Sequence, residues 1–243
     1  METQNQSRIL PTFGGSFEHG WKVMFDYFLV LLLVVIVMGI VMFPAQMLRI
    51  NFNTGHMEWC RDSFDFIGPG GFAAIGVFAI ILGIFAVIYM LLVVPVFKYG
   101  SDIMFVHAAR GTRPEFETLI KGFKENYLYI VLARLLSTAL IMLSMVLLIV
   151  PGIIVACRLA FVSYLVMDRK LDPIIAIEES WRLTKGNGWI IFAMGFVSFF
   201  ICILGFAMLF VGIIPAIMWV KSSFASLYEA VVTEKNGALA VSE

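Results

Sequence analysis

The sequence is poor in charged residues. Asp, Glu, Lys and Arg make up 14% of the 243 residues, whereas 61% are apolar and the mean hydropathy is +0.95. An ordinary soluble domain carries roughly a quarter charged and under about half apolar residues. That class is excluded, and the sequence predicts an integral membrane protein. Because 17 acidic residues balance 17 basic ones, no net charge is available to attract nucleic acid.

Residues that support catalysis or metal binding are also scarce. The cysteines and histidines are too few and too far apart in the sequence to form a disulfide framework or one metal site; they are Cys60, Cys157, Cys202, His19, His56 and His107. The sequence has no zinc-protease, nucleophile-elbow or phosphate-loop motif. A glycine-rich match to the dinucleotide fingerprint at 68–73 opens an apolar run instead of following a strand. We therefore expect no catalytic residues, no metal, no cofactor and no enzymatic activity.

Long apolar runs are what the chain does have, and a membrane-spanning helix needs about 20 such residues. The run 127–167 is interrupted at Pro151, which predicts two spans joined by a tight turn. The run that begins at Trp189 accommodates two spans if the second includes the half-polar stretch to Val232. The predicted fold is all-α, a single membrane domain over 1–243 with six transmembrane helices at about 28–48, 72–97, 127–150, 151–167, 189–210 and 212–232.

The basic residues predict the orientation of these spans. With six spans, Arg49 and Arg61 lie on one side, Arg134 and Arg158 lie within spans, and the other thirteen of the 17 Lys and Arg residues share the opposite side. Loops rich in Lys and Arg stay in the cytoplasm. We therefore expect a bacterial inner-membrane protein with both termini in the cytoplasm and the polar segment 49–70 as an outer loop.

Two cytoplasmic connections are predicted to form short amphipathic helices on the membrane surface, at about 114–124 and 173–185. The first follows a capping-box pattern that begins at Thr112, and its apolar residues recur at helical spacing. The second has Asp172 as an N-cap. Glu178 and Arg182 stand four residues apart, the spacing of a helical ion pair.

A weak internal repeat predicts that the six spans form three helical hairpins. Each unit has an aromatic anchor, an outward span, a proline and a return span; the anchors and prolines pair as Trp21 with Pro95, Tyr127 with Pro151, and Trp189 with Pro215. The alternative is that any six-span protein places aromatic residues at the interfaces and prolines near its turns.

The second half of the chain resembles a group of bacterial multi-pass inner-membrane proteins related to the membrane domain of some glycerophosphodiester phosphodiesterases. The resemblance rests on Val150 to Ile154, Arg158, Ala176, the Glu179-Ser180-Trp181 triplet and the Lys185-Gly186-Asn187 triplet. It implies a membrane location and no established reaction, because the catalytic domain of those enzymes is absent from this sequence.

Ionisable residues inside the apolar runs are the strongest functional signal, because a charge at membrane depth costs at least about 2.5 to 3.5 kcal/mol. Asp26 and Arg134 stand at similar predicted depths and are expected to form an intramembrane ion pair. One interpretation is structural, with Asp102 paired to Arg158 and the lysines extending to the headgroups. The other is a polar, cytoplasm-facing vestibule that binds an anion, lined by Lys98, Asp102, Arg158, Ser163, Lys221, Ser222, Ser226, Tyr228 and Glu229.

Two functions follow from these features. The first is a non-enzymatic membrane protein that binds or moves an anionic lipid or small amphiphile through the vestibule. The second is an accessory or scaffold subunit that docks a partner protein through its interfacial helices. The expected partners are the lipid bilayer, a bound anionic lipid, and a second copy of the chain or another membrane protein, without nucleic acid.

Overall fold

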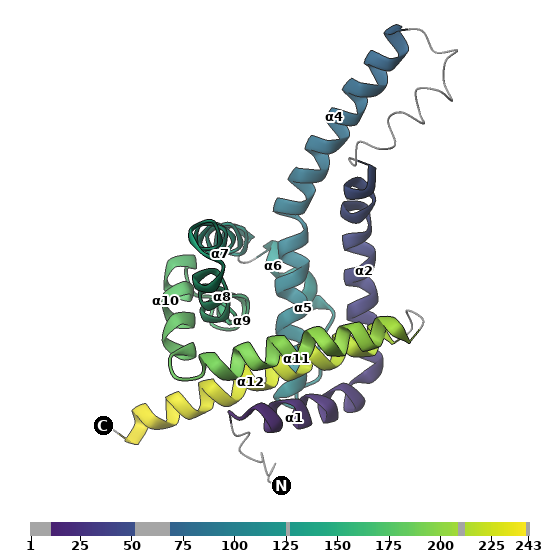
Figure 1. The fold of residues 1–243 in the computed structure, drawn as a ribbon. Coiled ribbons are helices and arrows are strands. Elements are labelled where there is room, and N and C mark those ends of the chain that lie inside the picture. The colour runs from purple at the N-terminus through teal and green to yellow at the C-terminus, as the bar shows by residue number, and fades with distance from the viewer. Residues whose placement is uncertain (1–10, 52–68, 125–126, 209–211, 242–243) are drawn as a thin grey trace.

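The computed structural model describes residues 11–51, 69–124, 127–208 and 212–241, and within these ranges every regular element is a helix (Figure 1). Most of the predicted outer loop, 49–70, lies outside the described residues. The prediction of an all-α protein is confirmed for the part of the chain that the structure covers.

The long apolar helices account for the membrane character of the chain. They are α2 (Phe28–Asn51), α4 (Pro69–Leu92), α7 (Tyr127–Leu147) and α11 (Gly188–Ala207). Large apolar side chains on them face outward; Val146 on α7, for example, is 84% exposed. The described residues contain four helical segments long and apolar enough to cross a membrane, and a fifth if the bent pair α1–α2 counts as one span. The four segments are Ile80–Ala109, Tyr127–Leu147, Ile149–Asp168 and Gly188–Ala207. The protein is therefore an all-α membrane protein with four or five candidate spans.

Helices that follow one another in the chain pack in pairs. Helix α7 packs against α8 (Ile149–Arg158), α11 packs against α12 (Ile213–Val241), and α2 packs against α4 and α5 (Val94–Ala109). Figure 1 shows that the pairs run in different directions. Helix α7 is seen end-on, α11 and α12 run roughly horizontally, and α2 and α4 run upward. The apolar ends of the pairs diverge from a common centre.

The predicted fourth span, 151–167, is discontinuous. Helix α8 ends at Arg158, and α9 (Val162–Asp168) begins after a short break. Helix α10 (Pro173–Thr184) closes this break, because the Ser180 hydroxyl donates to the Arg158 carbonyl at 2.7 Å and accepts from the Phe161 N–H at 3.3 Å. Freed backbone groups at membrane depth need such partners.

The hydrophobic core lies where α5, α9 and α12 meet. Phe105, Phe161 and Tyr228 are fully buried there, and the Phe161 and Tyr228 rings contact edge to face at 5.5 Å between centroids. Helix α5 is buried over nearly its whole length. This central region, and not the apolar arms, holds the charged and polar side chains that are buried together.

Helix α1 (Phe13–Asp26) was not anticipated from the sequence. It bends by 94° from α2 and lies along α12. The two helices approach closely at Gly20, where an added Cβ would stand 2.6 Å from the Ser223 Cα. The Trp219 indole also donates to the Phe17 carbonyl at 3.1 Å. Any side chain larger than hydrogen at position 20 would push the two helices apart.

Helices form in both segments that were predicted to be interfacial, as α6 (Glu117–Lys124) and α10, and their place at the membrane surface stays a prediction. The predicted capping box at Thr112 is wrong, because the Thr112 hydroxyl donates to the His107 carbonyl at 2.8 Å and so completes the end of α5. Asp172 does occupy the N-cap position of α10, although its side chain makes no capping hydrogen bond. Gly186, with a φ of +97°, follows the end of α10.

Candidate functional site

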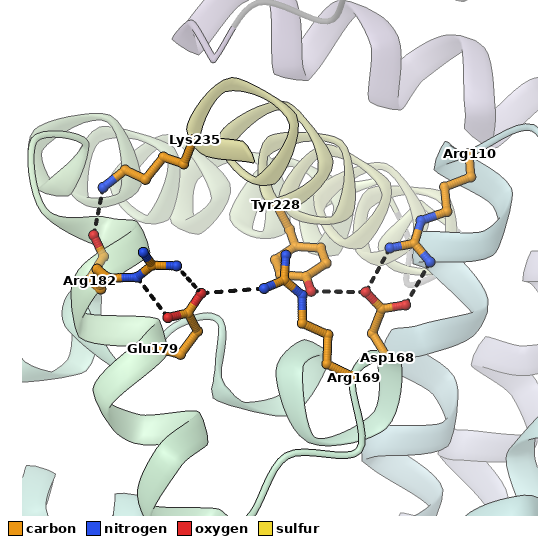
Figure 2. A network of polar contacts seen from close by, with 7 residues as sticks. All are labelled: Arg110, Asp168, Arg169, Glu179, Arg182, Tyr228 and Lys235. Carbon is orange, nitrogen blue, oxygen red and sulfur yellow. Dashed lines mark hydrogen bonds and ion pairs between the residues drawn. The ribbon is translucent and has the colours of Figure 1, made fainter. Parts of the chain in front are cut away.

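Charged side chains converge where the ends of α5 and α9 meet α10 and α12, as Figure 2 shows. Asp168, the last residue of α9, is the central acceptor: Arg110 approaches it from α5 and Tyr228 from α12. Glu179 of α10 lies between the guanidinium groups of Arg169 and Arg182. The network consequently joins α5 and α12 to the consecutive helices α9 and α10.

Arg110 makes the tightest contacts of this network. Its guanidinium donates to both Asp168 carboxylate oxygens at 2.6 and 2.7 Å, a bidentate geometry, and its Nε donates to Glu229 at 2.8 Å. The Tyr228 hydroxyl donates to the same Asp168 carboxylate at 3.0 Å. The hydrogen bonds to Asp168 raise the pKa of Arg110 above its ordinary value. One cation thus pairs with two largely buried carboxylates and fixes α5, α9 and α12 together.

The Glu179 part of the network is more exposed. Arg182 donates to both Glu179 oxygens, at 2.7 and 2.8 Å, and Arg169 stands 3.3 Å from one of them. The hydrogen bond from Arg182 holds the pKa of Glu179 below its ordinary value. The predicted partner of Arg182 was Glu178, which the structure corrects to Glu179, because Glu179 also faces Arg169. Lys235 extends the network by donating to the Arg182 carbonyl at 2.6 Å.

A second ionic group lies within the helices. The Lys221 ammonium of α12 contacts the Asp102 carboxylate at 2.9 Å and the Ser101 hydroxyl at 2.8 Å, both on α5. Lys98 stands one turn before Asp102 on α5, on the same face of the helix. This group therefore contains three of the residues that were predicted to line a vestibule.

Arg158 stands apart from both ionic groups. Its guanidinium lies over the Trp181 ring of α10, 5.7 Å from the centroid, in a cation–π arrangement. Its Nη1 is buried and has no hydrogen-bond partner among the residues that the structure describes. The alternative in which Arg158 pairs with Asp102 is not observed, because Lys221 occupies that carboxylate.

The other predicted vestibule residues divide between different surroundings. Tyr228 and Glu229 belong to the Arg110 network. Ser226 contacts His19 of α1 at 2.9 Å and donates to the Ser222 carbonyl, while the buried Ser222 hydroxyl has no partner in the described part of the chain. Ser163 is half-buried on α9. The nine residues are not gathered around one hollow, and their role as a ligand-binding set stays a prediction.

The predicted ion pair between Asp26 and Arg134 is not formed within the described residues. Both side chains are exposed. The reason is the bend after α1: Asp26 ends a helix that lies along α12, whereas Arg134 belongs to α7, which packs against α8, α9 and α10. Equal depth in two spans did not imply that the spans are neighbours.

Sequence reasoning did not predict that Arg110, Asp168 and Glu179 belong to one site. Glu179 was named only for the family resemblance, and Arg110 was given no site role, although its place directly before Gly111, which has a φ of +74°, marks the end of a helix. Asp168 lies 58 residues from Arg110, and no local spacing connects them. Among the described residues, no group of three or more His, Cys, Asp or Glu side chains is arranged to hold a metal ion.

Comparisons of the chain with family models, with curated proteins and with solved structures found no match. The resemblance to the membrane domain of glycerophosphodiester phosphodiesterases therefore stays a prediction.

Proposed function

We propose that this is a non-enzymatic integral membrane protein that binds or moves an anionic lipid or small anionic amphiphile, with Arg158 as the principal anion-binding residue. The observation that carries the proposal is the buried Nη1 of Arg158, for which the described residues offer no acceptor. An arginine does not lose its proton in proteins, so this group needs an anion, a carbonyl or water. An anionic headgroup would supply both the charge and the acceptor atoms.

The surroundings of Arg158 favour an anion. Trp181 covers one face of the guanidinium. The guanidinium also lies beside the first residue of α11, since a Cβ added at Gly188 would stand 3.9 Å from the Arg158 Cζ. The N-terminus of a helix carries partial positive charge and free N–H groups that attract anions. The break after α8 adds support, because discontinuous membrane helices line ligand sites in transporters.

The proposed topology has six spans arranged as three hairpins with cytoplasmic termini in a bacterial inner membrane. Packing between consecutive helices, α2 with α4 and α5, α7 with α8, and α11 with α12, supports the hairpins. Helix α12 is not among the candidate spans, but its polar residues Ser222, Ser226 and Tyr228 are buried against other helices. They would therefore not face lipid if α12 spans the membrane.

Thiol labelling tests this topology. Cys60 lies in the predicted outer loop, outside the described residues, and should react with a membrane-impermeant maleimide added to spheroplasts. A cysteine introduced at Glu243 should react only after the membrane is permeabilised. Labelling at position 243 from outside would contradict the six-span arrangement.

A thermal-shift experiment tests the lipid proposal. The purified protein in zwitterionic nanodiscs should gain thermal stability when an anionic lipid such as phosphatidylglycerol is added, because a ligand that binds only the folded state stabilises it. In Arg158→Gln this gain should be lost, and in Arg158→Lys it should be reduced. The control Lys22→Gln, which removes an exposed cation paired only with Glu18, should keep the full gain. An equal gain in wild type and Arg158→Gln would contradict the proposal.

The alternative, a scaffold subunit that docks a partner protein, is favoured by the outer face of α10. Ile174 and Ile175 are 61% and 52% exposed there, and either a partner or the membrane interface would cover them. Replacing both by serine should release a co-purifying membrane protein without changing the lipid-dependent thermal shift. If the thermal shift is lost and no protein is released, the helix face serves the membrane and not a partner.

A further inference from the structure

A cavity of about 140 Å³ lies at the ends of α5 and α9, beneath α6. Its polar lining comes from His107 on α5, Thr118 and Lys121 on α6, and Asp168 and Lys170 at and after the end of α9. We propose that this cavity binds a phosphate group, carried either by a lipid headgroup or by a free phosphate compound. None of these residues belongs to the Arg158 site, so the proposal does not rest on the function proposed above.

Helix α6 is built to present polar groups to this cavity. Thr118, Lys121 and Gly122 stand three and four residues apart and so share one face of the helix, and all three line the cavity. Leu119 packs against α5 at Gly100, where an added Cβ would stand 2.9 Å from the Leu119 Cα. Ile120, on another face, is 53% exposed. The close approach at Gly100 therefore holds the roof of the cavity near its α5 wall.

Three polar side chains around the cavity have no partner among the residues that the structure describes. Within the described residues, the side chains of His107, Thr118 and Lys121 make no hydrogen bond or ion pair, although Thr118 is only 6% exposed. A lysine offers three donors, and threonine and histidine each offer at least one. Buried polar groups normally find partners. Several donors directed at one small space indicate a ligand with several acceptor atoms.

The charge around the cavity selects an anion. Asp168 is the only carboxylate that lines the cavity in the described part of the chain, and Arg110 neutralises it with two hydrogen bonds. Lys121, for which no ion pair is found among the described residues, then contributes a positive charge to the cavity. Lys170 also has a φ of +51°, a left-handed backbone that non-glycine residues rarely adopt and that occurs more often at functional sites.

The size of the cavity limits what can enter. Sites for complete small-molecule ligands usually enclose about 300 to 1,000 Å³, so 140 Å³ has room for a compact group and not for a whole amphiphile. Phosphate has the compact shape and the several acceptor oxygens that these donors need, and lysine is a regular phosphate ligand. The remainder of the molecule would extend past the exposed Phe116 and Ile120, two side chains suited to the membrane interface.

Binding measurements on the purified full-length protein, with two probes, test the proposal. In one arm, nanodiscs contain phosphatidic acid in phosphatidylcholine, and lipid bound to the protein is measured by native mass spectrometry. In the other arm, inorganic phosphate is titrated by calorimetry. Lys121→Gln should weaken binding about tenfold in the arm that supplies the true ligand, because a hydrogen bond to a charged group is lost.

The variants separate binding from folding and from the Arg158 site. Thr118→Val removes the hydroxyl at nearly constant volume and should also weaken binding, which gives a second test if Lys121→Gln does not fold. Lys121→Arg should bind nearly as wild type, and the matched control Lys22→Gln and the variant Arg158→Gln should bind unchanged at this site. Weaker binding in the lipid arm identifies a headgroup, and weaker binding in the phosphate arm identifies a free phosphate compound.

The proposal is overturned if wild type binds neither probe, or if Lys121→Gln and Thr118→Val bind both as wild type does. If Arg158→Gln loses lipid while Lys121→Gln and Thr118→Val bind both probes as wild type does, the proposed function stands and this site is removed. If Lys121→Gln and Thr118→Val lose binding while Arg158→Gln keeps its lipid, this site stands and the proposed function is removed.

Discussion

Replacing Arg110 by glutamine should destabilise the protein more than any other single charge removal in the Figure 2 network. Asp168 and Glu229 are 12% and 14% exposed at their side chains, and Arg110 is 30% exposed. Without the guanidinium, two largely buried carboxylates would face each other with no cation hydrogen-bonded to them among the described residues, and only the charge of Arg169 would act on both. Removing one partner of a fully buried ion pair costs about 3 to 5 kcal/mol; allowing for the partial exposure of Arg110, we expect about 2 to 4 kcal/mol.

Equilibrium unfolding in mixed micelles measures this loss. The matched control is Arg182→Gln, which also removes an arginine hydrogen-bonded to a carboxylate, but one whose side chain is 52% exposed. An exposed pair is worth about 0 to 1 kcal/mol. The cost of Arg110→Gln should also shrink in an Asp168→Asn background, because only one carboxylate then remains uncompensated. Equal costs for Arg110→Gln and Arg182→Gln would refute this reasoning.

Two further predictions concern α1 and the acid limit of stability. Gly20→Ala should lower the free energy of unfolding by about 1 to 3 kcal/mol, because the new Cβ would stand 2.6 Å from the Ser223 Cα, whereas Gly14→Ala has open space around it and should be nearly neutral in the same unfolding assay. Arg182 keeps the pKa of Glu179 in the folded protein below its value in the unfolded chain. The contribution of the Glu179 carboxylate to the free energy of unfolding is therefore complete above the unfolded-state pKa of Glu179, and it is lost as the pH falls through the folded-state pKa. As the pH is lowered, the free energy of unfolding of Glu179→Gln should therefore fall less than that of wild type, by under about 1 kcal/mol. The same fall in both proteins would contradict this prediction.

The sequence predicted the apolar helices well because their signal is local. Tyr127 to Leu147 is a continuous apolar stretch between a polar connection and a turn, and the structure contains it as one helix. Helix α1 was overlooked even though Thr12 caps it and Phe13, Phe17, Gly20 and Met24 follow at helical spacing. Its glycines and polar residues concealed a helix that is stabilised mainly by packing against α12.

The charged network was beyond sequence reasoning for a different reason. Arg110, Asp168 and Glu229 meet because α5, α9 and α12 share one core, and 58 or more residues separate the partners of Arg110 from it in the chain. Arg158 shows the opposite case. Its depth within an apolar run correctly marked it as needing a partner, but only the fold shows Trp181 over its guanidinium and no acceptor for Nη1 among the described residues.

Native mass spectrometry of the protein, gently extracted from its membrane, tests the proposed anion site at Arg158 most directly. Wild type should retain an acidic lipid through delipidating activation, and Arg158→Gln should lose it while remaining folded, because Arg158 makes no ion pair within the described residues. If Arg158→Gln is folded and retains the same acidic lipid as wild type, Arg158 does not bind the anion and the proposed function is wrong.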